Sequence, residues 1–599
     1  MNNSRVANSL KSPAIRRSFN QIQAGREILR AVLLAFVLGS IPRSDAQVVP
    51  PDPEVGCTVN ATTVNGWFKS GSVTLNGVVN PANSVSFPNS PNCSFYEWSY
   101  QMFLWLTSPK PPIYGGGGSH IFESSSFFDV SPPDPNDPNQ ARTFIPHSTG
   151  LPSKFDVLKR QVGPNRLPII KDKQGRTFEI EPPPKQPLPL QIRSKAGQLV
   201  EISNVRPAEN GKKIFLDRAG KTIEPQFLTD SAAKNLKVGP GKLVPLPRIR
   251  QFIFNHIPIF VDSLGNVIEV EQGQAQDFAV LIAQNGSPIY YAIAVNEVYA
   301  YFRTMQGPVA PPGLFFPTRQ ADLNAITTFA TNHGKTFVDA EALAIEIKTS
   351  WIEAAGIPNP GDYITMTAEI PTYDKTTNPN LWTQSGHKTA QLAMVGMHVV
   401  GSANGHPEMI WATFEHIGNA PNDDYSYRNS VGAVTNVPRD TSGTWLFCAT
   451  GSSGPFNQPR NVLSGNDIAA VSTSPVGPDN IIRWKAWNAA SDMNPNFKTP
   501  AASNSEIISI NNSVRGLLIA GDVRRNYIMT GSTWMIAGSF PFTMFDMTEV
   551  GTSKANNATM ETFRQGTNNH AAGTFNCFGC HGGKTTTVSH IFDVTKPLF

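Results

Sequence analysis

Near its C-terminus the chain carries two cysteines and a histidine in the spacing C-x-x-C-H, at residues 577–581. Two thiols three residues apart on a tight turn can add to the two vinyl groups of one haem, and the adjoining imidazole can then bind the iron. The intervening Gly579 lets the backbone approach the porphyrin closely. With 5 Cys and 11 His in 599 residues, the motif arises by chance on the order of 10⁻³ times per chain. It predicts one covalent haem c, linked to Cys577 and Cys580, with His581 as the proximal ligand of the iron.

Two other interpretations of the motif are weaker. A redox-active C-x-x-C disulfide would be expected inside a thioredoxin-like βαβ pattern, and the surrounding sequence has none. A zinc site would need more Cys or His close by, and the chain has no second C-x-x-C. Haem c is therefore the preferred prediction.

The other side of the iron has few local candidates, because only 18 residues follow His581 and none of them is Met. His590 is the local candidate, and any other group must come from upstream. We therefore expect the tail to fold back against the main body, with the haem between them. Met560 is close in sequence, and its thioether would raise the reduction potential. The alternative is an open, five-coordinate iron, which would favour catalysis.

Further candidates lie on a long β-hairpin predicted over residues 387–418 and folded about Ser-Ala-Asn-Gly. A turn at this tetrapeptide places His398 opposite Trp411. Because side chains alternate along a strand, His398 and His416 then lie on opposite faces, and at most one of them faces the haem. Glu415 shares the face of His398 and could act as a proton-transfer carboxylate. For each distal candidate, an ordinary structural role is the alternative.

The first 46 residues have the features of an export signal, with a basic start, an apolar run over 31–41 and small residues before Gln47. An uncleaved membrane anchor is the alternative, but eleven helical residues rise only about 16 Å in a hydrocarbon layer about 30 Å thick. Cleavage would leave a periplasmic or secreted chain without a membrane span. The net charge is +4, and these 46 residues hold seven basic and two acidic side chains, which leaves −1 for the remainder. This charge gives no support for nucleic-acid binding.

The remaining three cysteines also need a role in an exported protein. Cys57 and Cys93 are predicted to form a disulfide, which would stabilise the folded state by roughly 3–4 kcal/mol. Cys448, among apolar neighbours in Thr-Trp-Leu-Phe-Cys, is predicted to be a buried thiol. A disulfide from Cys448 to either of the other two is the alternative.

Composition favours a mainly β (α+β) fold, an antiparallel β-rich body with a few helices, because the chain has 50 Pro, 47 Gly and only 16 % charged residues. Five parts are expected along the chain. They are the signal peptide (1–46), an N-terminal segment with an aromatic helix (47–160), a tandem β-hairpin insertion (161–275), a β-rich main body (276–555) and the haem c attachment segment (556–599).

The insertion is recognised by a repeated plan of strand, polar turn and second strand. The turn glycines are Gly175, Gly197, Gly220 and Gly265, and each is expected to adopt positive φ. Residues 237–246 occupy the place of a further unit. No residue in these repeats has ligand or catalytic character, so a structural module is expected.

Other elements are predicted from periodicity. Aromatic residues at helical spacing predict an amphipathic helix over 93–109, stopped by Pro109. Strands followed by a short helix are expected over 277–302, a strand pair over 525–536 and a short helix over 556–565. Residues 339–356 fit either a helix or a strand followed by a helix.

Several of these segments resemble a group of large, exported, mono-haem bacterial proteins of the cytochrome c family. The resemblance implies haem c attached at Cys577 and Cys580 with His581 as axial ligand, and it implies no substrate. The matching segments are CSFYEWSYQMFLWLTSP (93–109), IWATFEHIGNAP (410–421), NNATMETF (556–563) and NCFGCHGG (576–583).

In its layout the chain is also loosely similar to the cytochrome P-460 and cytochrome c′-β group, in which an antiparallel β domain ends in C-x-x-C-H and a short tail. Those proteins oxidise small nitrogen compounds or bind diatomic gases. This chain is far longer. Cytochromes P-460 also carry a covalent link between a lysine and the haem, and no lysine of this chain can be assigned that role.

Three hypotheses for function follow. The leading one is an exported mono-haem c-type cytochrome that exchanges electrons with a redox partner protein or a small-molecule donor or acceptor. The second is a haem-c oxidoreductase with an open distal site that acts on a small molecule. The third is a surface binding module in which the haem is a structural staple. No distinctive hydrolase or nucleotide-binding motif is present.

Overall fold

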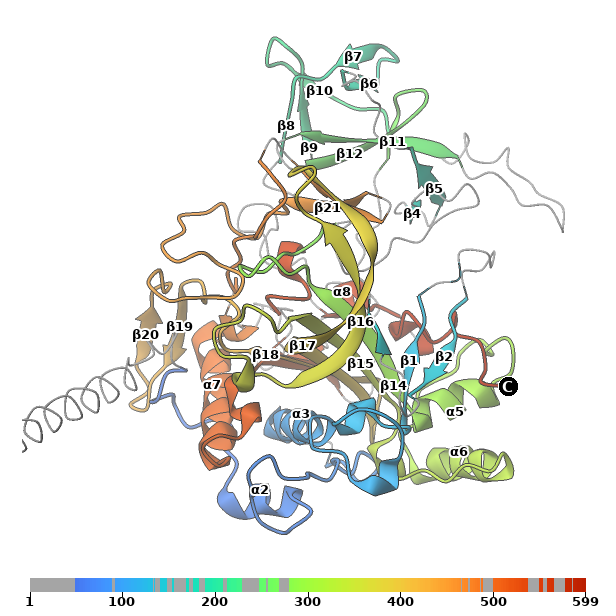
Figure 1. Ribbon diagram of the computed structural model, residues 1–599, viewed down its shortest axis with the longest axis vertical. Helices are drawn as coiled ribbons and strands as arrows, with labels where there is room; N and C mark the ends of the chain where they lie inside the picture. The colour runs from blue at the N-terminus through green and yellow to red at the C-terminus, as the bar shows by residue number, and fades with distance from the viewer. Residues whose placement is uncertain are drawn as a thin grey trace, which may run out of the picture. The chain divides into compact units, whose positions relative to one another are not determined.

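Strands far apart in the sequence pair into one large sheet, called the main sheet below, which contains twelve strands of the described residues. Eight of them follow the order β2-β1-β14-β15-β17-β18-β23-β24, and neighbours in this order are antiparallel. The predicted class, mainly β with a few helices, is confirmed (Figure 1). The strands are β1 (Phe127–Val130), β2 (Phe144–Pro146), β3 (Ser153–Lys154), β14 (Tyr290–Asn296), β15 (Ile345–Glu353), β16 (Thr365–Asp374), β17 (Leu381–Ala403), β18 (His406–His416), β21 (Asn461–Ser464), β22 (Asp467–Ala470), β23 (Tyr527–Met535) and β24 (Glu549–Gly551).

The computed structural model describes residues 49–599 with internal gaps, and Val48–Phe599 forms one compact unit. The predicted signal peptide, 1–46, lies outside the described residues. The gaps are 89–91, 133, 135–140, 148–152, 156–168, 172–175, 182–188, 208–212, 229–246, 255–256, 269–278, 465, 472–473, 485, 489–498, 537–548, 553–556, 565–576 and 584.

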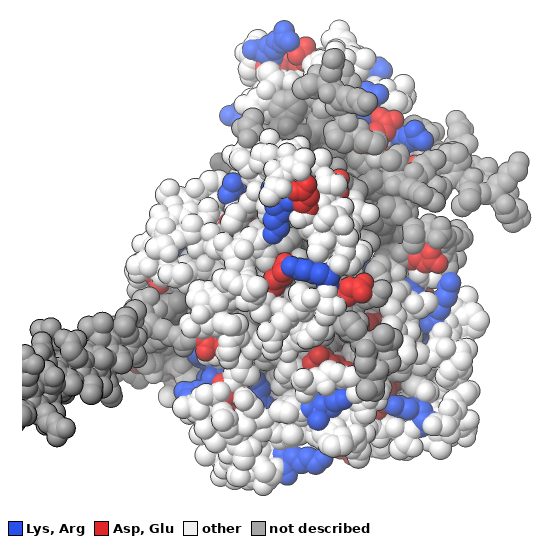
Figure 2. Space-filling view, viewed as in Figure 1, with Lys and Arg blue, Asp and Glu red and all other residues white. Residues whose placement is uncertain are grey.

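Helices lie before, between and after these strands. None of those in the described part of the chain is long and apolar enough to cross a membrane. Lys, Arg, Asp and Glu are scattered over the face drawn in Figure 2, most of which is uncharged. The α-helices are α2 (Ala61–Trp67), α3 (Asn92–Leu106), α5 (Glu297–Met305), α6 (Gln320–Asn332), α7 (Pro500–Leu517) and α8 (Cys577–Cys580), and a small hairpin pairs β19 (Tyr425–Arg428) with β20 (Val434–Val437).

One face of the main sheet, called the helix face, packs against α3 and α7. Its side chains alternate with those of the other face along β15, β17 and β18. They are apolar and share one core with the aromatic residues of α3 and the isoleucines of α7. The face is defined by Ile347, Met397, Val399, Ala412 and Phe414.

The opposite face, called the tail face, is covered by the C-terminal part of the chain. Its polar and charged side chains make hydrogen bonds with residues 557–561 and with Ser589, while Trp411 contacts the ring of His581 and shares an apolar core with Val400 and Phe578. The expected folding back of the tail against the main body is therefore confirmed. The tail face is defined by Glu346, Lys348, His398, Trp411 and Thr413.

The predicted N-terminal helix is confirmed as α3, but it is buried around most of its circumference and is not amphipathic. Phe95 stacks on Trp534 with ring centroids 3.9 Å apart, and Phe103 stacks on Phe414 at 4.3 Å. The predicted disulfide between Cys57 and Cys93 is confirmed, and it ties the first turn of α3 to the segment before α2.

The long hairpin is confirmed as β17 and β18, but its predicted register is wrong by two residues. Gly401 pairs with Ile410 and Ala403 pairs with His406, so β18 contains two extra residues between these pairs. Met409 in this bulge adopts a left-handed conformation with φ of 69°, which pairing rules do not anticipate. A slip of two residues keeps every side chain on its expected face.

The hairpin repeats form as predicted within the described residues. Gly197, Gly220 and Gly265 have φ between 76° and 83°, as turn glycines should, whereas Gly175 and residues 237–246 lie outside the described residues. The hairpins are distributed over three small sheets rather than one array. Their strands are β4 (Ile169–Lys171), β5 (Thr177–Ile180), β6 (Gln191–Arg193), β7 (Leu199–Glu201), β8 (Asn204–Pro207), β9 (Lys213–Leu216), β10 (Thr222–Ile223), β11 (Arg248–Phe254), β12 (Ile257–Asp262) and β13 (Val267–Ile268).

Three other segments differ from the sequence prediction or were left open by it. The ambiguous residues 339–356 contain the strand β15, preceded by a short 3-10 helix. The strand pair expected over 525–536 is wrong, because one strand, β23, covers it. In place of the helix expected over 556–565, the described residues form a turn and the 3-10 helix Thr562–Arg564.

Candidate haem-attachment site

The C-x-x-C-H motif lies on the single helical turn α8. The backbone N–H of His581 donates to the carbonyl of Cys577 at 2.9 Å, so His581 continues the turn that begins at the first cysteine. Phe578, only 1 % exposed, fixes the turn to the protein by packing in a core with Val588 and Phe592. Cys577 is partly buried against the same core, and the side chain of Cys580 lies outside the described part.

The imidazole of His581 is held by one of its two nitrogens. Its Nδ1 lies 2.8 Å from the carbonyl oxygen of Val588. A carbonyl oxygen only accepts hydrogen bonds, so Nδ1 carries the proton and Nε2 carries the free electron pair. Within the described residues Nε2 is buried and has no hydrogen-bond partner. A backbone carbonyl on one nitrogen and an available second nitrogen is the usual arrangement of a metal-binding histidine.

Several effects keep His581 neutral, as a metal ligand must be. Burial lowers its pKa well below the ordinary value for histidine, and charge interactions with His590, His398 and Lys348 lower it further. The hydrogen bond to Val588 opposes the shift but does not outweigh it. The residues present therefore fit an axial ligand to a haem iron.

Two aromatic rings touch His581. Trp411, on the tail face, lies with its ring centroid 4.2 Å from that of His581 at an angle of 45°. His590 stacks on His581 with centroids 4.2 Å apart and planes 15° from parallel. Imidazole binds a metal through an edge nitrogen and not through its face, so an iron cannot lie between these two stacked rings. The geometry places His590 beside His581 and not across an iron from it.

Charged groups of the tail face surround this position. His398 and Lys348 are directly opposite each other on β17 and β15, and His398 Nε2 lies 2.7 Å from Glu561 Oε1. The His398 and Glu561 side chains are 17 % and 12 % exposed. The Lys348 ammonium lies 5.1 Å from the ring centroid of Tyr291. The structure thus brings Glu561 against His398, and His398 and Lys348 are close enough to His581 to act on its pKa.

Two other distal candidates, Met560 and His416, are both buried. Met560 precedes Glu561 and is buried at 2 % exposure. His416 lies on the helix face, where its ring stacks on Tyr363 with centroids 3.8 Å apart. The predicted separation of His398 and His416 onto opposite faces is confirmed.

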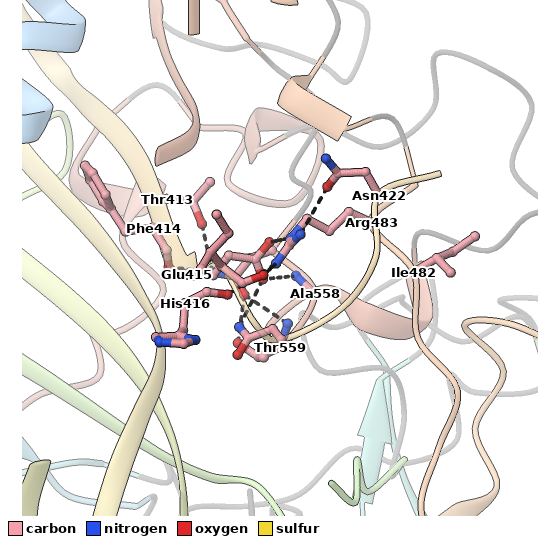
Figure 3. Close-up of polar contacts among 12 residues, drawn as sticks. Thr413, Phe414, Glu415, His416, Asn422, Ile482, Arg483, Ala558 and Thr559 are labelled. Atoms are coloured by element: carbon pink, nitrogen blue, oxygen red, sulfur yellow. Dashed lines mark hydrogen bonds and ion pairs between the residues drawn. The ribbon is translucent and has the colours of Figure 1, made fainter. Parts of the chain in front are cut away.

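Glu415 lies on the tail face, as predicted, but it is fully buried in an ion pair with Arg483. Burial raises its pKa, and the positive charge of Arg483 opposes the rise. Its second oxygen accepts a hydrogen bond from the backbone N–H of Ala558 at 3.0 Å. Figure 3 shows this network, in which Glu415 faces Arg483 and the 558–559 backbone.

Cys448 takes no part in the site. It is a buried thiol, 4 % exposed, and burial raises its pKa to about 11. The prediction of a buried thiol is confirmed, and the alternative disulfide is wrong because Cys57 and Cys93 pair with each other.

Sequence reasoning missed Glu561, Lys348 and the ring contact of Trp411. One signal was available, because Ile345-Glu346-Ile347-Lys348 alternates apolar and charged residues. Such alternation indicates a strand with one apolar face and one polar face, and Lys348 lies on the polar one. No local signal links Glu561 to His398, which are 163 residues apart.

Comparisons with protein-family models, with curated proteins and with solved structures found no match to this chain. In the described part of the chain, no group of three or more His, Cys, Asp or Glu side chains is arranged to hold a metal ion. A haem iron differs from such a site, because the porphyrin supplies four ligands and the protein only the axial ones.

Proposed function

We propose that this chain is an exported c-type cytochrome that carries one covalent haem c and takes part in electron transfer. The observation that carries the proposal is the state of His581, whose Nδ1 is held by the Val588 carbonyl while its buried Nε2 has no partner among the described residues. Cys577 and Cys580 would hold the haem through thioether bonds, and His581 would bind its iron. The haem would supply one-electron chemistry, and the protein sets the ligand, the polarity and the access of solvent.

Export to the periplasm or the exterior is part of the proposal. The Cys57–Cys93 disulfide supports it, because disulfides are typical of oxidising compartments. The electron would be exchanged with a redox partner protein or with a small-molecule donor or acceptor. Nothing in the site indicates which partner this is.

The first test is haem attachment. The full-length chain should be produced in a bacterial host that attaches haem c, and the mature protein examined by visible absorption and intact mass. We expect a haem c spectrum and the added mass of one haem. Replacing Cys577 and Cys580 by Ala should abolish both signals, whereas Cys448→Ala, the matched control at a cysteine outside the motif, should keep them. A colourless mature protein with the mass of the bare polypeptide would refute the proposal.

His581 is tested separately from the cysteines. In His581→Ala the thioether bonds can still form, so haem mass should be retained, while the spectrum changes because the iron loses its axial imidazole. His590→Ala is the control, since His590 stacks beside His581 and is not placed across an iron from it. An unchanged spectrum in His581→Ala would show that another group binds the iron.

A second candidate function is a haem-c oxidoreductase with an open distal site. It is favoured by Lys348 and His398, which act on the pKa of His581, and by Glu561 beside His398, because such groups can transfer protons to a bound small molecule. Visible and EPR spectra of the ferric protein separate the two candidates. A low-spin signal that does not respond to cyanide, nitric oxide or peroxide supports electron transfer. A high-spin signal that shifts with these ligands supports the oxidoreductase.

A further inference from the structure

A buried polar socket on the tail face holds residues 557–559, the turn that leads to Glu561. Asn557 Nδ2 donates to the Thr413 hydroxyl and to the Phe414 carbonyl, both at 3.0 Å. Asn557 Oδ1 accepts from the N–H and the hydroxyl of Thr559, at 2.9 and 2.7 Å. All four of these bonds are buried. Directional bonds of this kind fix one position for the turn.

Two more strands contribute to the socket. The Thr559 hydroxyl lies 2.7 Å from the Ser350 hydroxyl on β15, and its carbonyl accepts from the Tyr291 hydroxyl on β14 at 2.7 Å. Gly396 on β17 leaves the space for this approach, since a Cβ there would lie 2.5 Å from Thr559 Oγ1. The turn is therefore bonded to β14, β15 and β18 and lies close to β17.

A charged pair, Glu415–Arg483, also belongs to the socket and is drawn in Figure 3. Glu415 accepts from the Ala558 N–H, while Arg483 donates to the carbonyls of His416 and Ile417 at 3.2 Å. The side chains are 0 % and 3 % exposed, so each charge depends on the other. Among the described contacts, this pair bonds to the backbone of the turn at Ala558 and not to residues 577–581. Any effect of the pair on the haem site must therefore pass through this backbone.

Two hydrogen bonds connect Glu561 and its neighbour Thr562 to the turn. The N–H of Glu561 donates to the Asn557 carbonyl at 3.2 Å, and the Thr562 hydroxyl donates to the Ala558 carbonyl at 2.6 Å. Glu561 then lies against His398 at 2.7 Å. These two bonds link the position of Glu561 to that of residues 557–558, which the socket holds.

We propose that Glu415, with Arg483, is a positioning residue that sets the Glu561 carboxylate against His398 beside the haem site. This inference rests on the proposed function, because its consequence is the electrostatic environment of the iron. A carboxylate at a fixed place near the iron stabilises the ferric state and lowers the reduction potential. Glu415 acts on the iron only through Glu561.

The test is a double-variant cycle on the midpoint potential of the haem-loaded protein. Glu561→Gln should raise the potential, Glu415→Gln should raise it in the same direction, and the double variant should add little to Glu561→Gln alone. The matched control is Asp522→Asn, which breaks a comparably buried ion pair between Asp522 and Arg524. Arg524 donates to the carbonyls of Gly77 and of Leu104 on α3, and not to the socket. The control variant should leave the potential unchanged. Additive shifts, or no shift in Glu415→Gln, would overturn the proposal.

A second variant tests the same proposal if Glu415→Gln does not fold. Thr559→Val keeps the shape of the side chain and removes its bonds to Ser350 and Asn557. It should raise the potential and speed hydrogen exchange of backbone amides over 557–562. Thr331→Val, which removes a hydroxyl from an exposed position on α6, should do neither. Faster exchange with an unchanged potential would show that the socket is purely structural and would refute the positioning role.

The exchange measurement also separates this inference from the proposed function. If the purified protein carries no haem, the proposed function fails, and the mobility of 557–562 and the ring signals of His398 can still be compared between the parent and Thr559→Val by NMR. A change in both supports the positioning of Glu561 by the socket. A His398 signal that does not change would count against it.

Discussion

Adjacent residues of β18 point to opposite faces of the main sheet and meet different kinds of partner. Phe414, on the helix face, is fully buried and stacks on Phe103 of α3. Thr413, on the tail face, is nearly as buried and accepts a hydrogen bond from Asn557. The same contrast continues across β15 and β17, where Ile347 and Val399 face the helices while Lys348 and His398 face the tail.

The difference shows how one sheet provides both stability and a site. Burial of apolar area on the helix face is non-directional and contributes the larger free energy. Hydrogen bonds on the tail face contribute less net free energy, but each one requires a particular geometry. His581, which we propose as a haem ligand, contacts Trp411 of the tail face, and a cofactor site needs the fixed positions that directional bonds provide. Variants of paired residues on the two faces can test this division.

The largest effect on stability is expected for Phe414→Ala. Removing a fully buried ring that stacks on Phe103 should lower the free energy of unfolding by about 3–5 kcal/mol. Denaturant unfolding measures this loss. The visible spectrum of the folded protein should stay the same, because the helix face does not touch His581. The neighbouring variant Thr413→Val should cost only about 1 kcal/mol. A larger loss in Thr413→Val than in Phe414→Ala would contradict the comparison.

A smaller, pH-dependent effect is expected at Glu346 on the tail face. Burial raises its pKa to about 7, although the hydrogen bond from Ser589 and the charge of Arg142 oppose the rise. Between about pH 4.5 and 7 the native state holds a proton that the unfolded state has lost, so stability falls as pH rises through this window. The loss is on the order of 2 kcal/mol after allowance for partial exposure.

Glu346→Gln should remove this slope, and unfolding curves at several pH values would measure it. The variant should be the more stable protein at pH 8 and should differ little from the parent near pH 4. The exposed Glu341→Gln serves as the control, because it removes a carboxylate outside the tail face. A slope that persists unchanged in Glu346→Gln would assign the pH dependence to another group.

Local patterns in the sequence predicted the elements of both faces better than their pairing. The helix over Asn92–Leu106, the Cys57–Cys93 disulfide and the β17–β18 hairpin all have signals within a few dozen residues. The register failed at Met409, because left-handed backbone at a residue other than Gly has no sequence signal. Residues 525–536 were divided into two strands, although Gly531 lies within β23 beside a bulge and not in a turn.

The candidate site shows the same limit. The motif alone predicts Cys577, Cys580 and His581, because their spacing is local. The contact between His398 and Glu561 depends on the tail crossing the main sheet, and the placement of Lys348 opposite His398 depends on strand pairing. Neither is encoded within a short window of sequence. The surroundings of the histidine, which decide its chemistry, therefore required the structure.

The smallest expected difference, and the most direct test of the two faces, comes from two tyrosines. Tyr527 donates its hydroxyl to the Met394 carbonyl at 2.8 Å on the helix face, and Tyr291 donates to the Thr559 carbonyl at 2.7 Å on the tail face. Tyr291→Phe removes this one bond and should cost about 1 kcal/mol, whereas Tyr527→Phe also removes the bond that its hydroxyl accepts from the Ile364 N–H at 3.0 Å and should cost roughly 2 kcal/mol. Only Tyr291→Phe should speed hydrogen exchange over 557–562, because only this hydroxyl holds the tail. Equal exchange rates in the two variants would mean that the faces are coupled and that the tail is not held by directional bonds of its own.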